Sequence, residues 1–297
     1  LIADVSTFYH PASAGCKEHV LECVRHYDPS NMYSQEGWFG ILANWGFGYG
    51  FIAGPEASMH YKFNTTSGYS YFNPSKSLYD AFVAEEGADG YRLNAWIRTW
   101  EQVIAMNIAV NTTTNKYASE GYFRLKWLAS TDDEFVGYWC GNQSNTPVIR
   151  YADVLLMAAE ACLQAGDQAG ADEYLGRVRD RARLPRKSHV TLSDIKLERR
   201  LELAMEGMRF QDLKRWGDAP AVLADKGKKL PTFQIVPDPN NDLTTAAGIY
   251  NARYTTKTTY VDNEKSLAGW TPNRDEWLPF PENELEVNSN LKQNPGY

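Results

Sequence analysis

The sequence predicts a mainly α-helical fold with long irregular loops and a few short strands. Apolar residues recur every three or four positions across much of residues 150–217, which is the period of an amphipathic helix. Residues 1–72 lack this period, and part of that region interleaves aromatic residues with glycines. The chain has 297 residues, of which 43% are hydrophobic, so it is long enough to bury a sizeable core.

The first expected element is a short strand near the start of the chain. The stretch HVLECV, residues 19–24, is β-branched near both ends, and the turn-forming stretch DPSN follows it at residues 28–31. A loop-rich region then extends to about Asn73. Further on, AWIRTW at residues 95–100 is a second strand candidate, and a polar loop follows at residues 111–115.

A helix is expected to begin at Asn73 and Pro74. Asparagine is a favourable cap residue, and proline is favourable at the first helical position. Apolar residues follow at helical spacing, and the pattern ends near Glu86 and Gly87.

Residues 150–184 predict two helices joined by a short turn that contains Gly166. The pair resembles one tetratricopeptide-type repeat, a unit that normally stacks on neighbours to bury its faces. Either other packing replaces those neighbours, or they lie upstream of Leu1. The apolar stripes that define the two helices are Ala152, Leu155, Leu156, Ala159 and Leu163, then Ala171, Leu175, Val178 and Ala182.

A third long helix is expected from Thr191 to about Gly217. Thr191 and Asp194 have the spacing of a capping box, in which each residue satisfies a backbone amide of the other. The apolar stripe of this helix comprises Leu197, Leu201, Ala204, Met205, Met208 and Leu213.

Composition excludes several classes of function. The formal net charge of −7 and a pI near 5.4 argue against a nucleic-acid binder, which needs basic residues to neutralise phosphates. No apolar run approaches the length of a membrane span. Neither a metal-binding pattern nor a nucleotide-binding loop is present, so no cofactor is predicted. A disulfide between Cys16 and Cys23 remains open, and Cys162 is expected to be a small buried side chain.

Four blocks in order resemble the SusD/RagB family of outer-membrane nutrient-binding lipoproteins. They are NPSKSLYDAFVAEEGADGYRLNAWI, then RYADVLLMAAEACLQAGD with LGRVRDRARLP, then IKLERRLELAMEGMRFQDLKRWGD, and finally the C-terminal WLPFPENELEVNSNLKQNPGY. Together they extend over about residues 73–297. The resemblance implies a SusD-like fold with tetratricopeptide-like helical hairpins.

The resemblance also implies a position within a longer protein. Family members are roughly twice as long, so residues 1–297 are expected to form the C-terminal part of a single SusD-like domain. Residues 1–72 would be its strand- and loop-rich ligand side, and residues 73–297 its helical and C-terminal region. The N-terminal half, with its signal peptide and lipid-bearing cysteine, would be absent.

The function implied by the resemblance is non-catalytic capture of an oligosaccharide. Family members lie on the extracellular face of the outer membrane of Bacteroidetes. They deliver glycans, or in some members peptides, to a SusC-like TonB-dependent transporter. The lipid anchor would be the only membrane attachment, and it would lie outside this chain.

The ligand-binding candidates lie in GWFGILANWGFGYGFIAG, residues 37–54, which has six aromatics and six glycines. If this segment is extended, alternate rings face one side at about 6.5–7 Å spacing, close to the repeat of a sugar chain. The other interpretation is a core face, with glycines allowing close backbone packing. The candidates are Trp38, Trp45, Phe47 and Tyr49, with Tyr61 and Tyr71 in the loop-rich stretch that follows.

Two other classes of function remain as alternatives. A glycoside hydrolase would need two carboxylates facing a cleft, and Glu202 with Glu206 are the nearest sequence candidates. We interpret these instead as part of a charged framework, because arginines surround them. A helical-repeat scaffold that binds only protein would have no aromatic cleft. Trp270 and Trp277 are expected to be structural, flanking a chain that packs back on the helices.

Overall fold

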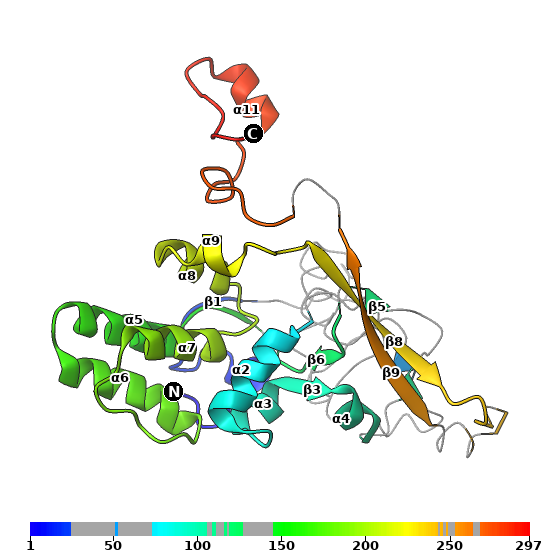
Figure 1. The fold of residues 1–297 in the computed structure, drawn as a ribbon. Helices are drawn as coiled ribbons and strands as arrows, with labels where there is room; N and C mark the ends of the chain where they lie inside the picture. The colour runs from blue at the N-terminus through cyan, green and yellow to red at the C-terminus, as the bar shows by residue number, and fades with distance from the viewer. Residues whose placement is uncertain are drawn as a thin grey trace, which may run out of the picture. The chain divides into compact units, whose positions relative to one another are not determined.

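The computed structural model describes residues 1–24, 51–52, 73–105, 109–110, 116–117, 119–126, 145–242, 244–245, 248, 253–263 and 268–297 (Figure 1). The described helices are η1 Pro11–Ser13, α2 Lys76–Glu86, α3 Tyr91–Trp96, α4 Trp100–Ala105, α5 Tyr151–Gln164, α6 Gln168–Arg181, α7 Leu192–Glu202, α8 Arg209–Arg215, α9 Ala219–Val222 and α11 Glu282–Val287. Most of the regular structure is helical, so the predicted mainly α fold with short strands is confirmed.

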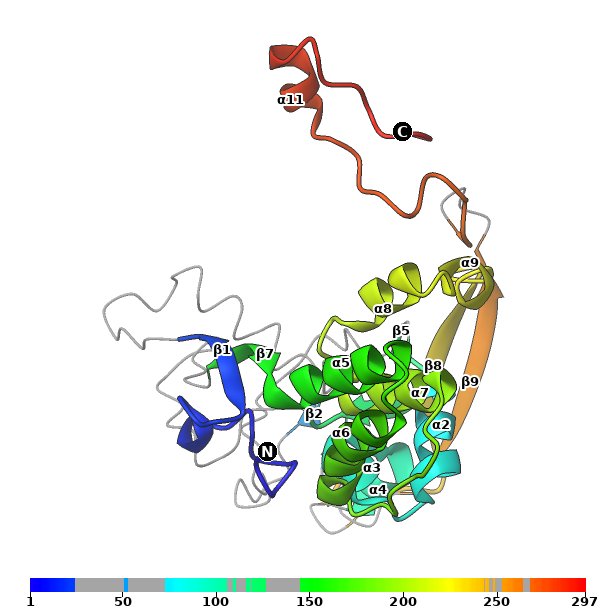
Figure 2. The same ribbon diagram turned by 90° about the vertical axis from the view of Figure 1, so that its left-hand side faces the viewer.

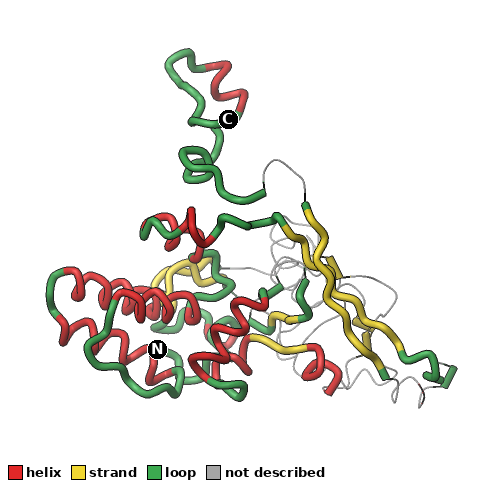
Figure 3. The backbone as a smooth tube through the Cα atoms, in the orientation of Figure 1, coloured by secondary structure: helices red, strands yellow, loops and turns green. Residues whose placement is uncertain are grey.

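Within the described residues the strands form four small sheets, in which the β1–β7, β2–β4, β3–β6 and β5–β8 pairs are antiparallel (Figure 3). One ribbon pairs β1 His19–Cys23 with β7 Thr146–Arg150, which confirms the strand predicted at residues 19–24. The other strands are β2 Phe51–Ile52 with β4 Ala109–Val110, β3 Ile97–Thr99 with β6 Tyr122–Arg124, and β5 Lys116–Tyr117 beside β8 Lys229–Pro237 and β9 Tyr254–Asp262.

The described residues divide into two compact units. The first comprises Leu1–Met205 with Pro231–Thr259, and the second comprises Glu206–Leu230 with Tyr260–Tyr297. In the described part of the chain, every helix is too short or too polar to span a bilayer.

The helical hairpin predicted at residues 150–184 is present in the first unit, where α6 lies beside α5 (Figure 2). Its turn contains Gly166 with a φ of 79°, a conformation that glycine adopts readily. The facing apolar stripes of α5 and α6 are buried. Together with Val190, just before α7, and Ile195 of α7, they form a hydrophobic cluster. That cluster comprises Leu155, Leu156, Ala159, Leu175, Val178, Val190 and Ile195.

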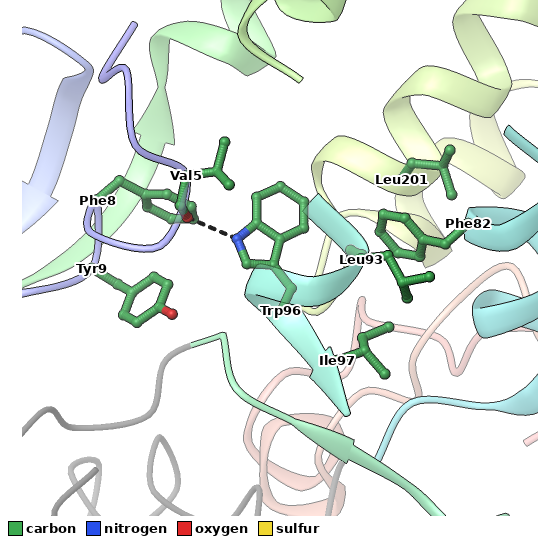
Figure 4. Close-up of a cluster of buried hydrophobic side chains, with 9 residues drawn as sticks. Val5, Phe8, Tyr9, Phe82, Leu93, Trp96, Ile97 and Leu201 are labelled. Carbon is green, nitrogen blue, oxygen red and sulfur yellow. Dashed lines mark hydrogen bonds between the residues drawn. The ribbon is translucent and has the colours of Figure 1, made fainter. Parts of the chain in front are cut away.

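A second hydrophobic cluster of the first unit forms around the N-terminal residues of the chain (Figure 4). Val5 and Phe8 are fully buried, although they belong to a segment with no regular secondary structure. The indole Nε1 of Trp96 donates a hydrogen bond to the carbonyl oxygen of Val5, at 2.8 Å. Phe82 of α2 and Leu201 of α7 complete the contact, so this segment joins α2, α3 and α7.

The second unit holds α8, α9 and the C-terminal residues. The rings of Phe210 and Trp270 lie 6.3 Å apart, which agrees with a structural role for Trp270. Trp277 is 57% exposed, and its ring centroid lies 5.8 Å from the ammonium of Lys214 in α8. Its carbonyl oxygen accepts a hydrogen bond from the hydroxyl of Tyr297, at 3.0 Å.

Several expected element boundaries need correction. The N-cap of α2 is Ser75, whose side chain accepts from the amide of Leu78, and Asn73 therefore precedes the cap. Only Ile97–Thr99 of the AWIRTW candidate is a strand, because helices occupy both sides of it. The capping box of Thr191 is confirmed.

The long helix expected after Thr191 is interrupted. It ends at Glu202, and α8 begins at Arg209. Between them Met205 has a φ of 64° and Gly207 a φ of 81°, and such left-handed residues do not continue a right-handed helix. The single-helix prediction is therefore wrong.

Candidate functional site

The six predicted ligand-binding residues lie outside the described residues, so their role stays a prediction. The structure instead describes the segments that flank them. Strand β1 ends at Cys23 before the aromatic segment, β2 contains Phe51, and α2 follows the loop-rich stretch. Phe51 is extended and pairs with Val110, as the extended interpretation requires at this one position. The residues outside the description are Trp38, Trp45, Phe47, Tyr49, Tyr61 and Tyr71.

The ribbon that precedes the aromatic segment is attached to the helical body through its buried end. His19 of β1 is opposite Arg150 of β7, and α5 begins directly after Arg150. The backbone amide of Tyr151 donates to the carbonyl oxygen of Glu18, at 2.7 Å. The β1–β7 ribbon is therefore joined to the α5–α6 hairpin at the end of the ribbon where His19 pairs with Arg150.

At this junction Glu202 forms the centre of a buried cluster of charges. Its carboxylate accepts hydrogen bonds from Arg150 at 3.0 Å, from Arg92 at 3.1 Å, and from Arg181. Burial raises the pKa of Glu202, but the nearby cations of Arg181, Arg150, Arg92 and Lys126 outweigh this effect and hold the pKa well below its ordinary value. Glu202 is therefore ionised and fully enclosed.

Glu18 is the second buried carboxylate of the cluster. It accepts hydrogen bonds from Arg150 and Arg181, each at 2.6 Å, through the same oxygen. Its other oxygen accepts the backbone amide of Ile2, also at 2.6 Å. One side chain thus links the N-terminal residues, β7 and α6. Since Arg150 and Arg181 contact both Glu18 and Glu202, the four groups alternate in charge.

Arg92 extends the cluster towards α2 and α6. Its guanidinium contacts Glu86 at 2.7 Å and Glu198 at 2.5 Å, and Glu198 in turn accepts from Arg179 at 3.1 Å. Arg179 also binds Glu85, at 2.6 Å. Burial raises the pKa of Glu86, and the charge of Arg92 only partly offsets that effect.

Lys126 neutralises the end of α7. Its ammonium donates to the carbonyl oxygen of Glu202, the last residue of α7, at 3.0 Å and to that of Ala204, two residues further on, at 2.9 Å. The same ammonium lies 3.8 Å from the ring centroid of Trp96 and 5.3 Å from that of Phe8. A cation at a helix C-terminus is favourable, and aromatic faces stabilise it further.

The burial and pairing of Glu202 favour a structural role for the charge cluster over a catalytic one. An acid–base pair needs a carboxylate that reaches substrate, whereas Glu202 is fully buried and binds three arginines. The framework interpretation of this residue is therefore confirmed. Buried pairs add little net stability, but removing one partner is costly, because it leaves the other charge uncompensated in the interior.

Within the described ranges, no group of histidine, cysteine or carboxylate side chains is placed to hold a metal ion. Cys16 and Cys23 are both free thiols, so the open question of a bridge between them is answered in the negative. Cys162 is partly exposed on α5, and the expectation of a buried side chain is wrong.

Residues 17–297, almost the entire chain, match the model of the SusD family. The chain belongs to the SusD family. The family expected from the four sequence blocks is thereby confirmed, and the match extends upstream of them to residue 17.

Curated SusD-family relatives match part of the chain. A SusD-like protein of Bacteroides ovatus is 31% identical over 170 residues, which cover 51% of this chain and 29% of that protein. SusD-like protein P2 of Formosa agariphila is 32% identical over 194 residues, which cover 59% of this chain and 29% of that protein. The aligned regions therefore represent less than a third of each relative.

Solved structures match the whole chain. A laminarin-binding SusD-like protein has a TM-score of 0.69 and 26% identity, covering 100% of this chain and 54% of its own. Surface glycan-binding protein A from Bacteroides fluxus has a TM-score of 0.66 and 25% identity, with the same two coverages of 100% and 54%. The chain thus spans about half the length of these solved SusD-family proteins.

The sequence of this SusD-family chain gave little basis for predicting which charged residues are buried. Glu18 and Arg150 are 132 positions apart, and no local pattern distinguishes them from surface residues. Lys126 follows Phe123 and Leu125 in an alternating pattern that assigns it to solvent, yet both faces of this segment are buried. The one available signal was the density of charge on an otherwise amphipathic α7.

Proposed function

We propose that this chain binds an oligosaccharide at the cell surface without cleaving it and delivers it to a TonB-dependent transporter. The observation that carries the proposal is the match along the entire chain to a solved protein described as laminarin-binding, at 26% identity and a TM-score of 0.69. The B. fluxus protein, described as surface glycan-binding, supports the same class of ligand.

Ring stacking would supply the affinity. A sugar hydroxyl exchanges hydrogen bonds with water for hydrogen bonds with protein at little net gain, whereas burial of the apolar face of the sugar ring is favourable. Trp38, Trp45, Phe47 and Tyr49 are the proposed stacking residues, and Tyr61 and Tyr71 would complete the same site. Tryptophan and tyrosine suit a half-wet surface, since each carries a polar group beside its ring.

The buried charge cluster would provide the fixed base that such a site requires. It holds the end of the β1–β7 ribbon through Glu18 and Arg150, and the aromatic segment follows β1 in the chain. Binding is tighter when the contact groups are held in place beforehand, because less conformational entropy is lost.

The transporter and the location belong to the same proposal, which family membership supports. The partner would be a SusC-like TonB-dependent transporter, and the site of action the extracellular face of the outer membrane. A lipid anchor outside these residues would provide the attachment.

Calorimetric titration with laminari-oligosaccharides, preceded by a glycan array, tests the ligand. Trp45→Ala and Tyr49→Ala are each expected to weaken binding about fivefold or more, since stacking of a nucleic-acid base on one aromatic ring, a similar contact, contributes about 1–3 kcal/mol. Trp277→Ala is the matched control, because this tryptophan is 57% exposed in a different part of the chain. Its affinity should equal that of the unaltered chain.

Two results would overturn the proposal. One is the absence of binding to every glycan on the array by a chain that is shown to be folded. The other is shortening of a labelled oligosaccharide, which would establish an enzyme. Loss of thermal stability in Trp45→Ala would instead assign that ring to the core.

A further inference from the structure

His19, the first residue of β1, has an enclosed side chain whose two ring nitrogens both lie against oxygen atoms. The side chain is 1% exposed. Its Nδ1 atom lies 2.6 Å from Oε2 of Glu22, and its Nε2 atom lies 2.7 Å from the carbonyl oxygen of Phe8. The ring therefore bridges β1 and the N-terminal segment that precedes η1.

Neither of these oxygen atoms can donate a hydrogen bond to the ring. A backbone carbonyl oxygen is an acceptor only. Burial raises the pKa of Glu22, but hydrogen bonds, foremost those from His19 and Gly15, outweigh it and hold the pKa below its ordinary value. This carboxylate is therefore ionised at neutral pH and also accepts only. Its Oε1 atom accepts the backbone amide of Gly15, at 2.7 Å, which holds the carboxylate in place.

Two acceptors require two donors, and only the charged form of histidine has them. A neutral imidazole has one N–H group and one lone pair, so one of its nitrogens would face an oxygen without a proton between them. The imidazolium ion donates from both nitrogens. Its bond to Glu22 joins opposite charges and is the stronger of the two. A ring that loses one proton should therefore keep the proton on Nδ1 and lose its contact with Phe8.

We propose that His19 is a proton-dependent clamp between β1 and the N-terminal segment. In the charged state the ring binds both Glu22 and the carbonyl oxygen of Phe8. In the neutral state it binds Glu22 alone, and the contact with Phe8 opens. Histidine is the side chain that ordinarily changes charge between about pH 5 and 8, and this clamp opens in the alkaline direction. The device goes beyond glycan binding, and its test uses no glycan.

The charged groups around the ring leave Glu22 as its direct partner. Within the described part of the chain, it is the one charged side chain that bonds to the ring. Arg150 of β7 is opposite His19 in the ribbon, but its guanidinium binds Glu18, at 2.6 Å, so this like charge is balanced by a buried carboxylate. The other titratable side chains of the N-terminal segment are Asp4, Tyr9, His10, Cys16 and Lys17.

Opening the clamp would change the structure locally. The side chain of Phe8 stays fully buried, with its ring against Arg150 and Trp96. Its carbonyl oxygen, once released from the ring of His19, has to bind water instead, since backbone carbonyl groups need a donor. The change is therefore confined to residues 8–19, which include η1.

Nitrogen-15 NMR of the histidine rings tests the clamp in the unaltered chain. At about pH 5.5 the ring of His19, assigned by comparison with His19→Phe, should carry a proton on both nitrogens, and at about pH 8.5 on Nδ1 alone. Two results would overturn the proposal. One is a neutral ring that carries its proton on Nε2, and the other is a ring that keeps both protons at the higher pH.

Thermal unfolding gives an independent test. His19→Phe keeps a planar ring but removes two contacts of the charged histidine at about pH 5.5 and one contact of the neutral histidine at about pH 8.5. The variant should therefore melt about 4 °C below the unaltered chain at the lower pH and about 2 °C below it at the higher pH. An equal shift at both pH values would contradict the proton dependence.

His189→Asn is the matched control for thermal unfolding. This histidine is exposed, and asparagine tolerates the left-handed φ of 54° at its position. The difference between this variant and the unaltered chain should be the same at both pH values. A pH dependence as large as that of His19→Phe would show that loss of any histidine has this effect, and the clamp would be refuted.

Discussion

The guanidinium of Arg150 lies 3.0 Å from the carboxylate of Glu202, and both side chains are almost completely buried. This pair joins β7 to α7 across 52 positions of the chain. The same guanidinium binds Glu18 beside β1, and its Cζ lies 4.3 Å from the ring centroid of Phe8. A strand, a helix and an irregular N-terminal segment therefore share one anchor.

Removing the charge of Glu202 tests this anchor. Glu202→Gln keeps the size of the side chain but leaves Arg92, Arg150 and Arg181 with less counter-charge in a buried site. We expect the free energy of unfolding, measured with urea, to fall by about 3–5 kcal/mol.

Surface ion pairs provide the comparison for Glu202. Lys76 and Asp80 form a pair in which both side chains are more than half exposed. Asp80→Asn should therefore change the free energy of unfolding by less than about 1 kcal/mol. A loss in Glu202→Gln no greater than that of Asp80→Asn would contradict the central role of the buried carboxylate.

Local signals in the sequence were sufficient to predict the helical hairpin and the capping box. The stripe of Leu155 and Ala159 repeats within a few residues, and Thr191 with Asp194 are three apart, so neighbouring positions carry the information. The interruption at Met205 was missed because MEGM fits a helical period, and only Gly207 gave a weak indication of a break.

The charge cluster and the N-terminal packing depend on contacts between distant residues. Nothing near Glu18 or Phe8 in the sequence indicates that α6, α7 and β7 enclose them. A polar or irregular segment is ordinarily assigned to the surface, and here tertiary contacts override that preference. The ligand site was predicted from ring spacing and family resemblance, and it stays a prediction.

The N-terminal segment should contribute to stability as strongly as a core helix. Phe8 is fully buried between Arg150 and Trp96, whose ring centroid lies 6.1 Å from its own. Phe8→Ala removes this packing and leaves a cavity, so the free energy of unfolding should fall by about 3–5 kcal/mol. Leu1→Ala, at a residue that is 37% exposed, is the control and should cost less than about 1 kcal/mol. Equal effects would show that the segment does not pack as described.

The capping box of α7 should make stability depend on pH. Partial burial raises the pKa of Asp194, but hydrogen bonds from Thr191 and Lys187 outweigh it and lower the pKa from 3.8 to about 2. Since the folded value is below the unfolded one, this carboxylate stabilises the fold above the unfolded pKa, and the stabilisation is lost as pH falls through the folded pKa.

Asp194→Asn measures that dependence directly. At neutral pH the variant should be less stable by about 1 kcal/mol, the usual contribution of a cap. The difference from the unaltered chain should shrink as pH falls from about 4 to about 2, because the carboxylate becomes protonated first in the unfolded state and then in the folded state. Asp225→Asn is the control, since this side chain is 89% exposed. A difference for Asp194→Asn that is the same at every pH would exclude the ionised carboxylate as its cause.

The break between α7 and α8 predicts a specific response at Gly207. Its φ is 81°, and a Cβ added there would meet no other atom within 4 Å, so any cost of substitution arises from the backbone alone. Gly207→Ala should lower the free energy of unfolding by about 1–2 kcal/mol, the cost of holding an alanine in the left-handed region. Gly207→Asn should lower the free energy of unfolding by less, since asparagine tolerates the left-handed region better than alanine does. If alanine stabilised the chain, α7 and α8 would be continuous in solution, and the single helix expected from the sequence would be right after all.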